Sequence, residues 1–238
     1  MVSFCCDLAA GAVGVALGWA RASVALCVLA AFVAPAAALS EPLAGWFAAQ
    51  SNLRTWSADL TQTRSLKVLS QPLVASGKVW VAPPDRFRWE LGQPAQTVAV
   101  RQNDKLSLIY PRLQRIEQYP LNAQSGPWRD ALALLEASFP RSRAEMEARF
   151  RLLSTTQSNA IVHVTLEPRS AAARKLIARL GISFRTNDFS LTATELKFGD
   201  GSSMLNDFVN PVLNAPIDAK LFDLSQYSNF TVVEPLRQ

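Results

Sequence analysis

Few side chains in this sequence could carry covalent or acid–base chemistry. His163 is the single histidine, and the three cysteines are Cys5, Cys6 and Cys27. Nucleophilic catalysis needs a nucleophile with a base and an orienting partner, and a zinc site needs several histidine or cysteine ligands. One histidine in the apolar run 161–164 supplies neither arrangement. The sequence therefore predicts that the protein is not an enzyme and holds no metal or other cofactor.

The charged residues also lack the spacing of a reactive site. Glu145 and Glu147 stand two apart in a predicted helix, so their side chains point in different directions. Glu195 and Asp200 fit an ordinary strand and an ordinary turn, and the sequence has no glycine-rich phosphate loop. The net charge is +5, but no compact run of Lys and Arg is present. We therefore expect no nucleic-acid partner.

The sequence offers apolar surface in place of reactive groups. Residues 86–91 alternate with the period of a half-buried strand, with Phe87, Trp89 and Leu91 on one face and Arg86, Arg88 and Glu90 on the other. The preceding strand, 73–81, places Trp80 on the face that also carries Val74, Ser76 and Lys78. A corner at Pro83-Pro84 joins the two strands. Large aromatic side chains are thus concentrated on one pair of strands.

A longer motif surrounds this corner. Pro84-Asp85-Arg86-Phe87-Arg88-Trp89 has the pattern Pro-x-x-Phe-x-Trp, preceded by Leu60-Thr61-Gln62 and followed by Pro94, a turn at Asn103-Asp104 and the pair Tyr110-Pro111. In order and spacing these motifs resemble the LolA-type periplasmic carriers, which escort lipoproteins to the outer membrane of Gram-negative bacteria. The resemblance covers residues 41–119. Beyond them it rests on Asn214, Phe222 and the strand patterns.

The resemblance implies an α+β fold that is mainly antiparallel β. The sheet would form a curved, half-open (unclosed) β-barrel of about 11 strands, with α-helices covering the concave face as a lid. We expect an acyl cavity lined by Trp46, Trp56, Trp80, Phe87, Trp89 and Leu91, and a lid helix that carries Trp128, Leu132 and Leu135. Phe87 matches an aromatic at the family's cavity entrance that is associated with one-way delivery. The same alternation also builds a filled core, so cavity and filled interior both remain open.

One position departs from the family pattern. The well-studied carriers place an arginine immediately before the motif's proline, where it bonds to the lid and holds the empty cavity closed. Here that position is Pro83, which has no side-chain donor. Arg86 and Arg88 are near in sequence but project away from the Phe87 face. We therefore expect a lid that opens more readily, or a closing switch built differently.

The remaining patterns predict a single domain. A helix starts at Glu41-Pro42, and the period changes to two at Trp56. Ser142 and Glu145 form a capping box at the start of a short helix, and the pattern over 126–148 is helical. Gly199-Asp200-Gly201 predicts a hairpin turn. Further strands are predicted at 73–81, 86–91, 96–101, 105–110, 113–119, 150–156, 160–167, 175–185, 189–198, 202–209 and 229–233.

The N-terminal segment predicts export. Between Leu8 and Leu39 the single charge is Arg21, followed by an apolar run and by Ala36-Ala37-Ala38, the small-residue pattern of a signal-peptide cleavage site. We expect residues 1–38 to be a cleaved signal peptide and 39–238 one LolA-like lipid- or lipoprotein-binding domain in the periplasm. All three cysteines would then be removed, which excludes disulfides. An uncleaved anchor is the alternative, because the segment exceeds the roughly 20 residues that span a bilayer.

These features together predict a carrier. The protein would bind acyl chains of lipoproteins or lipids in an apolar cavity and deliver them from the inner to the outer membrane, as a monomer. The resemblance implies an inner-membrane ABC-type lipoprotein release complex as donor and an outer-membrane receptor lipoprotein as acceptor. A lipid-sensing regulator of envelope-stress signalling with the same half-barrel is the alternative. A structural domain with a filled core is a third possibility.

Overall fold

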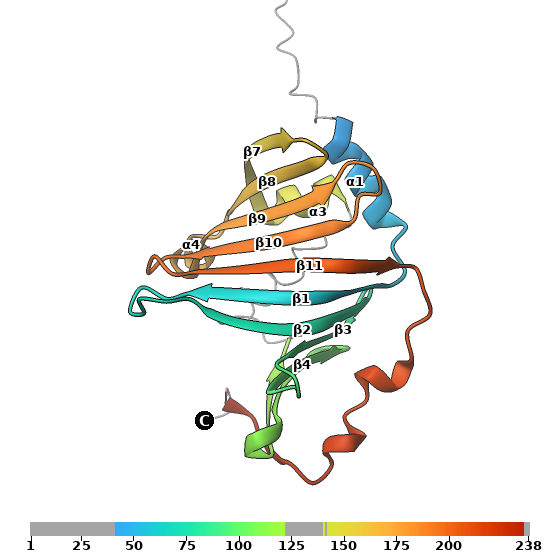
Figure 1. Cartoon of the computed structure of the whole chain (residues 1–238), viewed down its shortest axis with the longest axis vertical. Helices are drawn as coiled ribbons and strands as arrows, with labels where there is room; N and C mark the ends of the chain where they lie inside the picture. Colours follow the sequence, from blue (N-terminus) through green and yellow to red (C-terminus); the bar gives the residue numbers. More distant parts are fainter. Residues whose placement is uncertain (1–40, 122–139, 141, 236–238) are drawn as a thin grey trace, which may run out of the picture. The chain divides into compact units, whose positions relative to one another are not determined.

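The computed structural model describes residues 41–121, 140 and 142–235. Its strands form one sheet in the order β12-β6-β5-β4-β3-β2-β1-β11-β10-β9-β8-β7, antiparallel except that β12 runs parallel to β6 (Figure 1). The sheet is curved and unclosed, because β12 and β7 are its two ends. The strands are β1 (Trp56–Ser65), β2 (Leu73–Ala82), β3 (Arg86–Leu91), β4 (Thr97–Gln102), β5 (Lys105–Tyr110), β6 (Arg115–Pro120), β7 (Phe150–Ser158), β8 (Ile161–Pro168), β9 (Ile177–Arg185), β10 (Leu191–Phe198), β11 (Ser203–Leu213) and β12 (Thr231–Val233).

Short helices accompany the sheet. They are α1 (Glu41–Ser51), η1 (Pro111–Leu113), α3 (Arg143–Arg149), α4 (Ala171–Leu176), η2 (Ala219–Phe222) and η3 (Ser225–Tyr227). The predicted capping box is confirmed, since the Ser142 hydroxyl accepts a hydrogen bond from the Glu145 amide at 3.1 Å and α3 follows directly. The expected half-open, mainly antiparallel fold is therefore confirmed.

The cross-strand register gives the sheet two distinct faces. We call the inner face the one that carries the row Ala58, Val79, Trp89, Ala99 and Leu108, and the outer face the one that carries Ser57, Trp80, Arg88, Val100 and Ser107. Residues directly opposite in an antiparallel pair point to the same side of the sheet. Each face can therefore be followed from strand to strand through the register.

Helix α1 packs on the inner face and forms the main core with it. The Trp46 ring stacks on the Phe184 ring, with centroids 5.1 Å apart and planes 12° apart. Gly45 allows this approach, because a Cβ at that position would overlap the Phe189 ring. Met146 from α3 and Phe150 complete the cluster over β8, β9 and β10. Burying an aromatic side chain of this size stabilises the fold by about 3 kcal/mol.

The C-terminal segment, residues 214–235, covers the outer face of β2–β6. It leaves the end of β11 and passes through η2 and η3 to β12 at the far edge of the sheet (Figure 1). Its Phe222 is buried in a second cluster with Ala82, Val98, Val100, Ile109 and Ile116. Arg88, only 5% exposed, donates to the Leu221 carbonyl at 3.0 Å and to the Tyr227 hydroxyl at 3.2 Å, and it pairs with Glu90. Arg88 therefore holds this segment on the outer face.

Several predicted boundaries are wrong for local reasons. The strand predicted at 175–185 starts only at Ile177, because Ser170 caps α4 and its alanine-rich run continues through Leu176. Phe189, predicted to open a strand, lies in a turn with φ 54°. Strand β11 extends to Leu213, four residues beyond the prediction. The helical pattern over 126–139 lies outside the described residues.

We predict that Arg88→Met loosens the C-terminal segment. A buried charge-assisted hydrogen bond contributes about 1.5–3 kcal/mol, so the variant should lose about 2–3 kcal/mol of unfolding free energy. Hydrogen exchange should quicken over residues 219–230 and stay unchanged in β8–β10.

Arg86→Met is the matched control. Arg86 lies on the same face with its guanidinium carbon 5.4 Å from the centre of the Phe222 ring. An exposed cation–π contact contributes only about 0.5–1 kcal/mol. Equal exchange over 219–230 in the two variants would contradict the role assigned to Arg88.

Candidate functional site

The inner face brings together most of the aromatic residues singled out in the sequence. Trp56 is opposite Val81, which is opposite Phe87, while Trp89 is opposite Val79 and Leu91 is opposite Gly77. Trp56, Phe87, Trp89 and Leu91 therefore share this face, and Trp46 approaches it from α1. The structure places Trp80 on the opposite face, because it pairs with Arg88.

A cluster of edge-to-face rings occupies the centre of the inner face. The Phe208 ring lies 5.1 Å from Trp56 at 82° and 5.9 Å from Trp89 at 83°. Trp56 and Phe208 are buried, whereas Trp89 is half-buried. Edge-to-face geometry of this kind fixes ring orientation more tightly than area burial alone. The rings of Trp56 and Trp89 are therefore held in fixed orientations. They lie between the main core and the inner face of strands β3–β6.

The inner face of β3–β6 is apolar but only partly withdrawn from solvent. Leu106 and Tyr119 are buried there, and Phe87, Ala99, Leu108 and Leu121 around them are partly buried. Here the described residues leave partly buried aromatic and aliphatic side chains next to a closed core. This part of the inner face, which we call the β3–β6 surface, can take up an apolar ligand without directional bonds.

Charged groups border the β3–β6 surface. Arg101 shares the inner face with Phe87 and Leu106, its register partners, and burial lowers the pKa of its guanidinium. The Tyr119 hydroxyl donates to Glu117 at 2.9 Å, and Glu117 pairs with Arg115 at 2.7 Å. Burial, and then the hydrogen bond to Glu117, raise the pKa of Tyr119 to about 12. The surface is thus apolar at its centre with a cation beside Phe87.

Arg101 is the residue that sequence analysis missed. Neither Arg86 nor Arg88 reaches the inner face, as their side chains engage the C-terminal segment. The strand predicted at 96–101 would have placed Arg101 with Thr97 and Ala99. Only the register of the β3–β4 hairpin shows that Arg101 lies opposite Phe87 and that Ala99 lies opposite Trp89.

A polar ladder crosses the inner face in the middle of the sheet. The Gln62 amide donates to Asn206 at 3.0 Å, and the Asn206 amide donates to Thr194 at 3.1 Å. All three side chains are buried. Because each strand contributes one member, a one-residue slip would leave these buried groups unpaired. The ladder therefore fixes the register of β1, β11 and β10.

Helix α1 carries two buried polar atoms that the sheet does not satisfy. The Trp46 indole nitrogen and the Gln50 side-chain oxygen have no hydrogen-bond partner among the described residues. They lie one helical turn apart, so a donor and an acceptor face the same side of α1. Buried groups of this kind are rare in folded proteins and cost stability.

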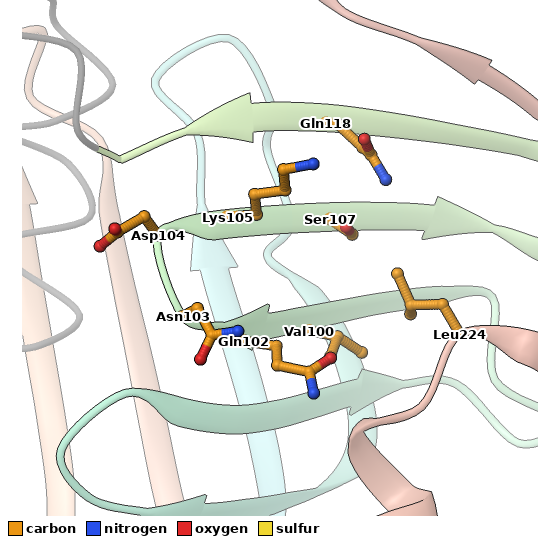
Figure 2. Close-up of a pocket in the computed structure, with 8 residues that line it drawn as sticks. All are labelled: Val100, Gln102, Asn103, Asp104, Lys105, Ser107, Gln118 and Leu224. Atoms are coloured by element: carbon orange, nitrogen blue, oxygen red, sulfur yellow. The ribbon is translucent and has the colours of Figure 1, made fainter.

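The outer face carries two small hollows away from the aromatic residues of the inner face. One, of about 340 Å³, is lined by Val100, Gln102, Asn103, Asp104, Lys105, Ser107, Gln118 and Leu224. Figure 2 shows that these come from β4, β5, β6 and the C-terminal segment, with the Asp104 carboxylate turned away from the others. The other, of about 120 Å³, adjoins Trp80 and Leu221. The amide and charged lining of the first hollow does not suit acyl chains.

The predicted lid residues Trp128, Leu132 and Leu135 lie outside the described residues. Within residues 41–121 and 142–235, no three His, Cys, Asp or Glu side chains gather as a metal site. The same part of the chain contains no helix with the length and apolarity to cross a bilayer. His163, the single histidine, lies exposed on β8 with its Nδ1 2.9 Å from the Ser183 hydroxyl.

The sequence matches the family model of the outer membrane lipoprotein carrier protein LolA over residues 51–225. The chain belongs to the LolA family. Proteins of this family are periplasmic, and they are carriers or binders rather than enzymes. The match extends well beyond Tyr119, where the sequence motifs become sparse. A search of curated protein sequences found no match.

Solved structures with a similar fold are remote in sequence. A putative outer membrane lipoprotein-sorting protein domain from Vibrio parahaemolyticus is 11% identical, with a TM-score of 0.43 over 79% of this chain and 97% of that chain. A LolA superfamily protein from Nitrosomonas europaea is 8% identical, with a TM-score of 0.39 over 75% and 96%. A chain of the Pseudomonas aeruginosa MucA/MucB complex is 13% identical, with a TM-score of 0.41 over 75% of this chain and 59% of that chain. Family membership rests on the family model.

We predict that Tyr119 destabilises this LolA-family fold at high pH. Its folded pKa of about 12 lies above the ordinary value of 10.0, so its contribution to stability is complete below pH 10 and is lost as the pH rises toward 12. Tyr119→Phe should remove this part of the alkaline loss in unfolding free energy. Tyr227→Phe, on the outer face, is the control. An unchanged alkaline slope in Tyr119→Phe would contradict the assignment.

Proposed function

We propose that this protein is a periplasmic carrier that binds the acyl chains of lipoproteins or lipids on the β3–β6 surface. The observation that supports the proposal is the group of partly buried apolar side chains around Leu106 and Tyr119, continuous with the edge-to-face rings of Trp89 and Phe208. Each buried methylene contributes about 0.8 kcal/mol, so a few acyl chains would bind tightly even after ordering costs.

Polar groups around this surface suit the other end of an acylated ligand. Arg101 would lie beside the polar end of chains that contact Phe87. Trp80 has no part in the proposed site, because it lies on the outer face.

Delivery would follow affinity differences without covalent chemistry. We expect loading at an inner-membrane ABC-type lipoprotein release complex and release to an outer-membrane receptor lipoprotein, with the carrier acting as a monomer. Export through the signal peptide at residues 1–38 would bring domain 39–238 to the periplasm.

Native mass spectrometry tests this proposal. The protein would be purified from the periplasm of cells expressing the full-length sequence and weighed before and after organic extraction. We expect added mass that extraction removes and that fragments as an acylated protein or lipid. A clean unliganded mass that takes up no added acylated peptide would contradict the proposal and favour a filled core.

Phe87→Ala tests the location of the site. Truncating a half-buried aromatic at the ligand contact should weaken binding of a fluorescent fatty-acyl probe by about tenfold, since a tenfold change corresponds to about 1.4 kcal/mol. Trp80→Leu is the matched control, because it removes a half-buried aromatic from the outer face of the neighbouring strand. Equal loss in both variants would place the acyl site elsewhere.

A further inference from the structure

The hairpin between β1 and β2 exposes several large apolar side chains to solvent. Val68 is 88% exposed, Leu69 45%, Leu73 50% and Val74 62%. They lie in or beside the turn 66–72, which the Leu69 amide closes by donating to the Leu66 carbonyl at 3.0 Å. Exposed apolar groups that cluster mark interaction sites more often than scattered ones do.

This hairpin extends past the end of its neighbour. Ser65, the last residue of β1, pairs with Ser203, the first residue of β11, so residues 66–72 reach beyond the paired strands. The turn between β10 and β11 projects on the same side (Figure 1). Strands β1 and β11 are neighbours in the sheet, so both turns leave it at the same end. The two turns therefore lie close to each other.

Helix α4 extends the same rim. The Gly199 amide donates to the Leu176 carbonyl at 3.1 Å, which ties the end of α4 to the β10–β11 turn. Leu176 is 39% exposed, so five of the eleven large exposed apolar side chains in the described part of the chain belong to this rim. We call the β1–β2 turn with the first two residues of β2, the β10–β11 turn and α4 together the apolar rim.

The charges of the apolar rim are mostly positive. Exposed cations on it or on the adjoining strand ends are Arg64, Lys67, Arg174, Lys175, Arg179 and Lys197. Opposite charges there are Asp200 and Glu195, which pairs with Lys197 at 3.6 Å. Cations outnumber carboxylates, and the side chains that protrude furthest are aliphatic. This combination is complementary to an anionic lipid surface.

We infer that the apolar rim docks this protein reversibly on an anionic bilayer, with Val68 and Leu69 entering the headgroup region and Lys67 and its neighbours contacting lipid phosphates. A hairpin turn with two protruding side chains offers little area compared with the roughly 800 Å² per partner of a stable protein interface. It is sufficient for weak membrane contact, which needs only a few apolar groups and local cations. This inference concerns the membrane and does not depend on acyl cargo.

Vesicle cosedimentation tests the inference. The probe is vesicles of three parts phosphatidylcholine to one part phosphatidylglycerol, compared with phosphatidylcholine alone. The protein is purified after expression of the full-length sequence, and its N-terminus is checked by mass. We expect binding to the anionic vesicles that weakens with salt and is much lower on neutral ones. V68S/L69S should lower the partition coefficient about tenfold or more, and K67Q about fivefold.

R112Q/L113S is the matched control. Arg112 and Leu113 are exposed on η1, between β5 and β6, and present the same pairing of a cation with an exposed leucine. The control should bind as the unchanged protein does, and all variants should keep their urea midpoints and their uptake of the acyl probe. Failure of the unchanged protein to bind anionic vesicles, or equal binding by V68S/L69S, would overturn the inference.

Discussion

An open sheet with one mainly apolar face has to be covered by something other than itself. The alternation of side chains puts Val162, Ile182, Leu60, Val79 and Leu108 on the same side of strands that run from one end of the sheet to the other. A closed barrel would bury such a face by curling around it, but here β7 and β12 do not meet. Burial therefore depends on helices, and the stack of Trp46 on Phe184 is where α1 meets this need. The β3–β6 surface is the continuation of the same face where, among the described residues, cover is incomplete.

Strands β2–β6 also need to be covered on the outer face of the sheet. Strands β2–β6 carry apolar residues on both sides, as Val98, Val100 and Ile109 show. The C-terminal segment covers that second side, and the buried Arg88 secures it through its bonds to Leu221 and Tyr227. The outer face of β2–β6 is covered in this way, whereas the β3–β6 surface on the inner face keeps partly buried apolar side chains. The polar ladder from Gln62 to Thr194 then fixes the register on which the composition of that face depends.

The proposed carrier function accords with the apolar character of the β3–β6 surface. A carrier has to hold a ligand firmly and still release it, and nondirectional burial suits both needs. A polar contact at the margin, from Arg101 beside Phe87, would orient the ligand. The apolar rim at the β1–β2 turn lies apart from the Phe87 motif, so membrane contact and cargo binding can be varied independently.

Local patterns in the sequence determined much of this protein. The two-residue period placed Phe87 with Trp89, and Trp80 with Lys78, and the capping box placed the start of α3, because each depends only on neighbours along the chain. The tertiary structure alone decided which of the two faces of a strand meets the core. Trp80 is large and aromatic like Trp89, yet it points outward, because a segment more than a hundred residues later supplies a second apolar cover. The pairing of Gln62 with Asn206 and of Arg101 with Phe87 likewise follows from strand register, which residues distant in sequence set and no local period encodes.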